Sequence, residues 1–269
     1  MDIRIVDTTL RDGEQRSGIV LGLKEKLHIA KILDCLGIYQ IEAGIPVMGG
    51  DEKKSVYKMM ELGLKSKISA WNRMNIKDIK ESIDCKPDII HITIPSSDIH
   101  IQNKLCKDRK WVLDNMKKCV SYAKDHDFEV TIGLEDASRA DFNFLLELIE
   151  EAHKMGVQRV RYADTVGVLY RQYVYNEIAN IKKNIKPIEI EIHVHNDFGM
   201  AVSNSLSSVR AGAKYVDCTI GGIGERAGNC DLLKFVTSAS ELLGACKEYD
   251  TRNIVRAQYE VLRLMKRIA

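Results

Sequence analysis

This chain lacks the features that mark membrane, secreted and disulfide-bonded proteins. No apolar run reaches the roughly 20 residues that a membrane-spanning helix needs, and no signal-peptide core precedes the first strand-like segment. Its seven cysteines are odd in number and never fall in a C-x-x-C spacing, which argues against a disulfide framework or a zinc ribbon. Free cysteines are typical of a reducing compartment. We therefore expect a cytoplasmic protein with no membrane partner.

An excess of charge of one sign is missing as well. The net charge of the 269 residues is only +2, which gives no long-range field of the kind that nucleic-acid-binding proteins carry. Hydrophobic residues make up 45% of the chain and charged residues 29%, as in an ordinary globular protein. No low-complexity segment or linker divides the sequence. We expect one large domain and no nucleic-acid partner.

Short apolar runs, typical of buried strands, alternate along the whole chain with longer amphipathic stretches, typical of helices. The expected strands are 4–7, 40–43, 67–71, 88–94, 129–134, 159–163, 188–195 and 215–220. The expected helices are 24–36, 51–62, 76–83, 109–126, 141–155, 171–185, 203–211 and 231–243. Glycines 37, 63, 156 and 212 stand where four of these helices should end.

Eight such units predict an α/β protein with a closed TIM (β/α)8 barrel. A doubly wound open sheet is the alternative, but no G-x-G-x-x-G motif follows the first strand. We assign residues 1–248 to a TIM-barrel catalytic domain. Residues 249–269 form a C-terminal helical extension, with one further helix expected over 251–268.

Asp12, His193 and His195 are candidate metal ligands. Two histidines at i and i+2 on a strand project from the same face, and a carboxylate supplies the hard oxygen that a divalent ion prefers. In a closed barrel the first strand lies beside the eighth, and the eighth lies beside the seventh. Position 12, just after the first strand, therefore lies near the end of the seventh strand. The alternative is that the histidines are packed strand residues and Asp12 is a loop cap. The position of all three at strand ends disfavours that alternative.

Two further residues fit the same rim. Asn229 ends a glycine-rich loop, residues 221–229, and could offer an amide oxygen to the metal; the alternative is a flexible loop. Arg11 could stabilise negative charge that develops on a ketone or carboxylate oxygen. A structural salt bridge at the rim is the competing interpretation of Arg11.

Proton transfer and substrate binding have their own candidates. Glu135 and Asp136 end the fifth strand and Thr165 follows the sixth, where a carboxylate and a hydroxyl could move protons or bind a substrate carboxylate. Arg73, after the third strand, is a weaker candidate. We interpret His91 as a core histidine.

Three segments resemble signatures of the isopropylmalate synthase/homocitrate synthase family. They are residues 10–15 (LRDGEQ) with Lys26, residues 190–201 with the His-x-His-Asn-Asp string, and residues 224–229 (GERAGN). The similarity spans nearly the whole chain. It implies a Claisen-type condensation in which a 2-oxo acid binds a divalent metal (Mg, Mn or Zn) and acetyl-CoA is the co-substrate.

The resemblance also implies residue roles. The metal ligands would be Asp12, His193, His195 and Asn229. Arg11 would polarise the ketone and Glu135 would take part in the proton-transfer relay. The oxo acid would contact Arg11, Gln15, Arg73 and Thr165.

The identity of the oxo acid depends on smaller segments. Residues 45–48, 71–74 and 161–167 look most like homocitrate synthases of the nitrogen-fixation type, which implies 2-oxoglutarate as substrate, homocitrate and CoA as products, and a role in nitrogenase iron-molybdenum cofactor biosynthesis. Lysine-pathway homocitrate synthases carry an arginine where this chain has Thr131, so isopropylmalate or citramalate synthesis stays open. A lyase on the related barrel is disfavoured because its catalytic cysteine precedes the Gly-Asn pair, whereas Cys230 follows Asn229 here.

Members of this family continue past the barrel into a region that supplies a catalytic histidine across the subunit interface. The present sequence stops at Ala269. We therefore expect a second polypeptide carrying that region, a hetero-oligomer, and slow turnover by the isolated chain. A non-catalytic subunit of a split synthase is the alternative.

Overall fold

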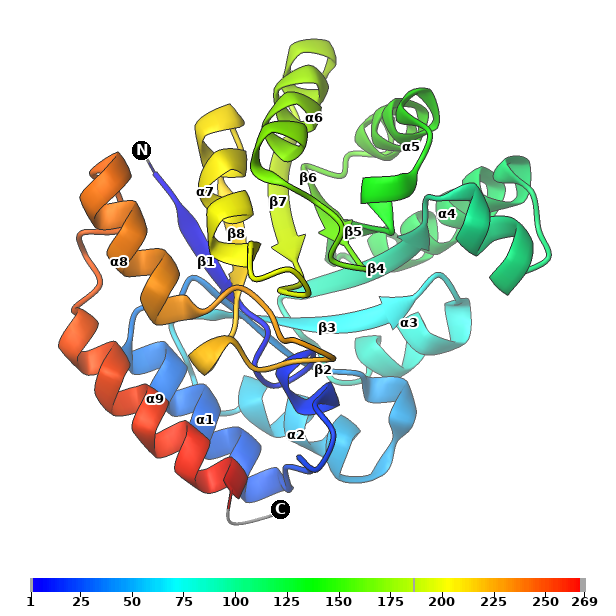
Figure 1. The fold of residues 1–269 in the computed structure, drawn as a ribbon. Helices are drawn as coiled ribbons and strands as arrows, with labels where there is room; N and C mark the ends of the chain where they lie inside the picture. Colours follow the sequence, from blue (N-terminus) through cyan, green and yellow to red (C-terminus); the bar gives the residue numbers. More distant parts are fainter. Residues whose placement is uncertain (1, 186, 267–269) are drawn as a thin grey trace.

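The computed structural model describes residues 2–185 and 187–266, and its centre is a closed barrel of parallel strands (Figure 1). The strands are β1 (Arg4–Asp7), β2 (Gln40–Gly44), β3 (Lys67–Arg73), β4 (Ile89–Pro95), β5 (Glu129–Glu135), β6 (Arg159–Asp164), β7 (Glu189–Val194) and β8 (Tyr215–Cys218). They follow one another around the ring in sequence order, and β1 pairs with β8 to close it. The predicted TIM barrel is confirmed.

Helices surround the barrel and return the chain from each strand to the next. They are α1 (Leu23–Cys35), α2 (Gly50–Met60), α3 (Ile76–Ile83), α4 (Arg109–Lys124), α5 (Phe142–Lys154), α6 (Arg171–Asn184), α7 (Ala201–Ala211), α8 (Leu232–Leu243) and α9 (Thr251–Lys266). Each expected helix is present, with ends that differ by at most two residues. Helix α2, for example, starts one residue early and ends two residues early.

The strands are buried on both faces, because helices cover the outside and side chains fill the inside. In β4, for example, Ile90, Ile92 and Ile94 are buried, as are the residues between them apart from the partly exposed Thr93. The inner face is unusual for its charge. Glu42, Arg161 and Glu191 are all nearly or fully buried within the ring.

The last helix, α9, packs against α1 and α8 on the outside of the barrel (Figure 1). It covers residues 251–266 of the predicted helix, and residues 267 and 268 lie outside the described part. Ile254, Val261 and Met265 form its buried face. The division of the chain at residue 248 stays a prediction.

Across the described residues, every helix falls short of the length and apolarity required to cross a bilayer.

Candidate active site

The three predicted metal ligands meet at the carboxyl ends of the barrel strands. Asp12 follows β1, His193 lies in β7, and His195 comes directly after it. Their ligand atoms lie within 4.8 Å of one another, and all three residues are buried. The Nε2 atoms of His193 and His195 lie 3.3 and 3.7 Å from the Asp12 carboxylate. The geometry therefore presents one carboxylate and two imidazoles to a common point.

Hydrogen bonds fix which imidazole nitrogen faces that point. The Nδ1 atom of His193 lies 2.9 Å from Oδ2 of Asp217, and Nδ1 of His195 lies 3.2 Å from the Asp164 carbonyl oxygen. Because these acceptors engage Nδ1, both Nε2 atoms are left for the cluster. This arrangement is typical of histidine ligands whose second nitrogen is held by a carboxylate or a carbonyl.

The residues present fit a divalent cation. The buried Nε2 of His195 and the buried Oδ1 of Asn229 have no hydrogen-bond partner among the described residues. The Asn229 amide donates from Nδ2 to Asp12 Oδ1 and to the Ile223 carbonyl, both at 3.0 Å, so Oδ1 is the free end of that side chain. A Cβ at Gly224 would lie 2.0 Å from Asn229 Nδ2, so only glycine allows this loop to approach the cluster. Buried polar atoms without a hydrogen-bond partner are costly to the folded state unless a ligand binds them.

The protonation states follow from the charges around the cluster. Burial would raise the pKa of Asp12, but Arg11 and the two histidines outweigh it and hold that pKa well below its usual value. Burial would likewise lower the pKa of His193, but the carboxylates of Asp12 and Asp217 raise it to about 9. Asp12 is therefore anionic, and His193 holds a proton that a bound cation would replace.

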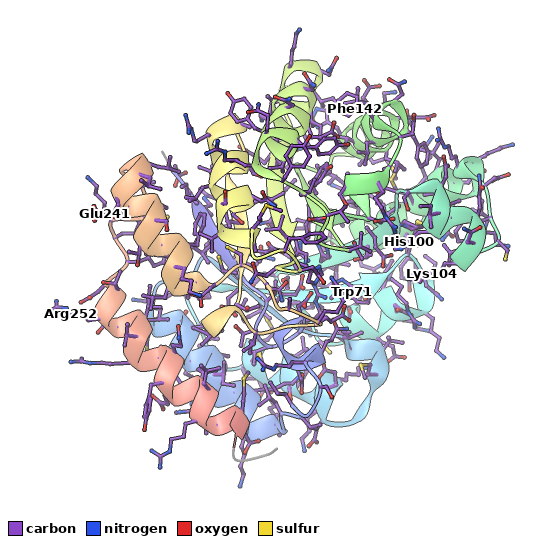
Figure 2. All side chains as sticks on the ribbon, viewed as in Figure 1. Trp71, His100, Lys104, Phe142, Glu241 and Arg252 are labelled. Atoms are coloured by element: carbon purple, nitrogen blue, oxygen red, sulfur yellow. The ribbon has the colours of Figure 1, made fainter. Side chains whose placement is uncertain are left out.

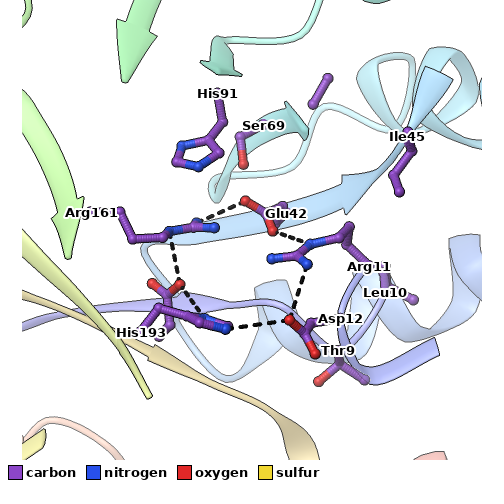
Figure 3. Close-up of polar contacts among 12 residues, drawn as sticks. Thr9, Leu10, Arg11, Asp12, Glu42, Ile45, Ser69, His91, Arg161 and His193 are labelled. Carbon is purple, nitrogen blue, oxygen red and sulfur yellow. Dashed lines mark hydrogen bonds and ion pairs between the residues drawn. The ribbon is translucent and has the colours of Figure 1, made fainter. Parts of the chain in front are cut away.

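Arg11 belongs to a ring of charges that runs through the cluster (Figure 3). Going round the ring, each side chain contacts the next: Arg11, Asp12, His193, Asp217, Arg161, Glu42, and Arg11 again. Arg11 donates from Nε to Glu42 at 2.6 Å and from Nη1 to Asp12 at 3.0 Å. Its guanidinium is thereby fixed beside the candidate metal ligands.

Sequence reasoning missed half of this ring. Glu42, Arg161 and Asp217 lie inside strands that the pattern identifies only as apolar, and Glu191 pairs with Arg161 behind them. A usable signal was present: charged residues stand within runs that were expected to be buried on both faces. Such charges persist in a barrel interior only where they are paired.

A cavity of about 180 Å³ opens over the cluster. Seven of the nine predicted site residues line it: Arg11, Asp12, Gln15, Glu135, Thr165, His193 and His195. The Thr165 hydroxyl accepts a hydrogen bond from the Asp136 backbone N–H at 2.8 Å, so its own proton is free to donate. Asp136 itself pairs with Arg139 and Ser97, which makes it a structural residue of the rim.

His91 also lines this cavity, although it is buried as expected for a core residue. Its Nδ1 lies 2.9 Å from the Thr131 hydroxyl, while its Nε2 has no partner among the described residues. Burial lowers the pKa of His91 to about 3, so the imidazole is neutral. The interpretation of His91 as a core histidine is therefore incomplete, because its ring borders the candidate substrate space.

Arg73 lies elsewhere, in a neighbouring cavity of about 320 Å³. Both Nε and Nη2 of Arg73 donate to the Asp78 carboxylate, at 2.7 and 3.0 Å. The neighbouring cavity shares Trp71, Thr93 and Glu135 with the first one. Lys104 and Trp111 line its outer part, and Figure 2 shows Trp71 near the barrel centre with Lys104 at the edge beside α4.

Comparisons with known proteins show what this chain is similar to. The model of the HMGL-like family matches residues 2–261. The chain is 57% identical, over 99% of both lengths, to the homocitrate synthase subunit alpha of Clostridium pasteurianum. It is 52% identical over 87% of its length to 2-isopropylmalate synthase 2 of Caldanaerobacter subterraneus and 43% identical over 94% of its length to homocitrate synthase 1 of a Nostoc species. It spans 61% and 67% of these two longer proteins.

Solved structures show the same fold. The hydroxymethylglutaryl-CoA lyase of Pseudomonas aeruginosa superposes with a TM-score of 0.84 at 18% identity, covering 98% of this chain and 93% of the lyase. The carboxyl transferase domain of Rhizobium etli pyruvate carboxylase, solved with pyruvate and biocytin, gives a TM-score of 0.78 at 16% identity, covering 98% of this chain and 47% of that chain. At such identities the likeness concerns the fold alone.

Proposed function

The chain belongs to the HMGL-like family, and from this membership we propose that it is the barrel subunit of a homocitrate synthase. The proposed reaction condenses acetyl-CoA with 2-oxoglutarate and water to give homocitrate and CoA. The observation that carries the proposal is the 57% identity to a homocitrate synthase subunit along 99% of the chain. A role in nitrogenase iron-molybdenum cofactor biosynthesis is part of the proposal.

Four side chains would hold the divalent metal to which the oxo acid binds: Asp12, His193, His195 and Asn229. The bound metal (Mg, Mn or Zn) would supply Lewis-acid chemistry to the ketone of the oxo acid. Arg11 would stabilise the negative charge that the ketone oxygen gains on attack. Because Glu42 and Asp12 already fix its guanidinium, this charge is stabilised without reorganisation.

Glu135 is suited to proton transfer because it borders both cavities. The cavity with Trp71, Lys104 and Trp111 would receive acetyl-CoA, and the metal cavity would receive 2-oxoglutarate. The acetyl methyl group would then reach the boundary between them, where the Glu135 carboxylate can remove a proton. Gln15 and Thr165 would bind the oxo acid. Arg73 lines the cavity proposed for acetyl-CoA and would contact substrate from there.

We also propose that a second polypeptide completes the enzyme. The relative that matches this chain along 99% of both lengths is named a subunit, whereas the longer relatives contain further residues. The complete enzyme would then be a hetero-oligomer.

The substrate assignment is tested with the full chain, alone and mixed with the companion subunit of the Clostridium enzyme. Acetyl-CoA, Mn²⁺ and one oxo acid at a time are supplied, and thiol release is followed. We expect the highest rate with 2-oxoglutarate and the companion present. A higher rate with 2-oxoisovalerate or pyruvate would contradict the assignment and favour isopropylmalate or citramalate synthesis.

The metal assignment is tested by Asp12→Asn. Loss of the anionic ligand should weaken Mn²⁺ binding at least about tenfold and reduce the rate of the assembled enzyme by a similar or larger factor. Manganese titration followed by electron paramagnetic resonance reads binding without turnover. Asp114→Asn, an exposed carboxylate on α4, removes the same charge far from the cluster and should change neither value. Full activity of the Asp12→Asn assembly would favour a scaffold role.

A further inference from the structure

A groove outside the barrel mouth has no role in the proposed chemistry. It encloses about 340 Å³ between the end of α9, the loop before α1 and the loop after β8. Its lining is mostly apolar or small: Arg16, Ser17, Gly18, Ile19, Gly221, Ile223, Leu262 and Met265. Figure 1 shows the described end of α9 beside the segment that leads into α1. We call this feature the α9 groove.

Exposed apolar side chains continue from the α9 groove along α9. Tyr259 is 71% exposed and Val255 is 51% exposed. With Leu262 of the groove wall they are spaced i, i+4 and i+7, which places all three on one side of the helix. Val20, next to Ile19 of the groove, is 70% exposed. Large exposed apolar side chains grouped around a groove are typical of a protein-binding surface.

The charge beside this surface that lacks an ion-pair partner is positive, because the exposed Glu260 carboxylate pairs with His28. Arg16, Arg256 and Arg263 are exposed and form no ion pair within residues 2–185 and 187–266. Arg256 and Arg263 lie seven residues apart on α9, next to the apolar side chains. An occupant with apolar side chains and flanking carboxylates would therefore be complementary to the surface.

The α9 groove also borders the metal loops from behind. The Ile223 carbonyl accepts a hydrogen bond from the side-chain amide of Asn229, the candidate ligand, at 3.0 Å. A Cβ on Gly13, the residue after Asp12, would lie 3.1 Å from the Ile223 side chain. A segment seated in the groove would thus pack against the backs of the two loops that carry Asp12 and Asn229.

We propose that the α9 groove is the docking site for an apolar, carboxylate-flanked segment of the second polypeptide. This inference rests on the proposed function, because the split enzyme supplies the partner. Three observations support this occupant: the relative named as a subunit, the apolar groove and the unpaired arginines. A second copy of this chain is disfavoured because it carries the same positive charge on this face. Docking would order the two metal loops and link assembly to metal affinity.

The test measures the dissociation constant between the full chain and the full-length companion subunit of the Clostridium enzyme by sedimentation velocity. Tyr259→Asp and Val20→Asp should each raise it at least about tenfold, since buried interface anchors have effects of this size. Arg263→Glu should also weaken binding, and more so at low salt. Leu242→Asp, an apolar residue 72% exposed on α8, is the matched control and should stay within about twofold of the parent.

Hydrogen exchange supplies an independent readout. Amides of residues 16–19 and 221–223 should exchange more slowly when the companion is bound. The docking site would be overturned if Tyr259→Asp and Val20→Asp both bound the companion as tightly as the parent chain does. It would also be overturned if the parent chain formed no complex with the companion. A third contrary result would be that the substitutions disrupt a homodimer of this chain and leave the heteromer intact. Failure of the proposed function would look different: 2-oxoglutarate would not be turned over, while the effects on subunit binding would persist.

Discussion

At the scale of single residues, the cluster depends on a carboxylate that never reaches the cavity. Asp217 holds Nδ1 of His193 and is itself paired with Arg161 at 2.9 Å. It therefore sets both the rotation of the imidazole and the nitrogen that faces the candidate metal site. Removing its charge leaves Arg161 with one fewer acceptor and His193 without a fixed orientation.

We predict that Asp217→Asn weakens Mn²⁺ binding by about 10–100-fold, the usual effect of removing such a supporting carboxylate. Titration calorimetry on the folded chain measures it. Glu191→Gln is the control, because Glu191 contacts the same Arg161 without touching His193. Equal losses in both variants would mean that the charge of the interior, and not the orientation of His193, determines affinity.

Single residues also show how far sequence reasoning reaches. Asp12, His193 and His195 could be identified because polar groups at strand ends in a barrel have one place to converge. Arg73 is itself the last residue of a strand, but Asp78 on α3 lies close enough to bind its guanidinium outside the cavity of the cluster. Glu42 and Asp217 could not be assigned partners. The alternation of side chains along a strand says which face a residue lies on, but it does not say which charges meet across the ring.

At the scale of elements, the loops after β1 and β8 are held as one unit. The Thr9 hydroxyl accepts a hydrogen bond from the Ile220 backbone N–H at 2.9 Å, and the Thr219 hydroxyl donates to the Ile223 carbonyl at 2.7 Å. The first bond joins the loop that carries Asn229 to the loop that carries Asp12, and the second braces the loop after β8 internally. The relative position of two candidate metal ligands therefore depends on a buried threonine.

We predict that Thr9→Val lowers the free energy of unfolding by about 1–3 kcal/mol, because the buried Ile220 N–H loses its acceptor. Mn²⁺ affinity should fall as well. Thr8→Val is a close control, since the buried Thr8 hydroxyl has no partner among the described residues, and its removal should be neutral or stabilising. Urea unfolding compares the two, and an equal loss in both would contradict the role of the Thr9 bond.

Element boundaries differ from the sequence prediction for identifiable reasons. Strand β3 runs to Arg73, two residues beyond the predicted end, because pairing with β4 continues through Thr93. Strand β7 stops at Val194, one residue short of the prediction, because His195 pairs with Asn229 of the β8 loop instead. Cross-strand pairing decides both ends, and it is not contained in the pattern of one segment.

At the scale of the whole molecule, the interior of the barrel makes stability depend on pH. Asp7 is fully buried; its Oδ1 accepts the Thr9 N–H at 2.8 Å and its Oδ2 has no partner among the described residues. Burial raises its pKa from 3.8 to about 7, although the bonds from Thr9 act in the opposite direction. Between these two values the folded state keeps a proton that the unfolded state releases, so Asp7 makes stability fall as pH rises.

We predict that Asp7→Asn gains stability relative to the parent as pH rises from about 4 to 7, by up to about 4 kcal/mol. An asparagine has no proton to lose, so only the parent carries this dependence. His91, with its lowered pKa, has the opposite slope but is shared by both proteins and cancels in the difference. Urea unfolding at several pH values measures it, and parallel profiles would contradict the prediction.

Closure of the ring between β1 and β8 has a consequence for the order of events during synthesis. Asp12 leaves the ribosome among the first residues, and Asn229 only after more than two hundred others. The chain is synthesised from the N-terminus onward, and a domain generally folds as a unit. The nascent chain therefore has no complete binding site for most of its translation. With the proposed ligand set, metal capture would be deferred until nearly all of the barrel exists, and only a finished ring would be loaded.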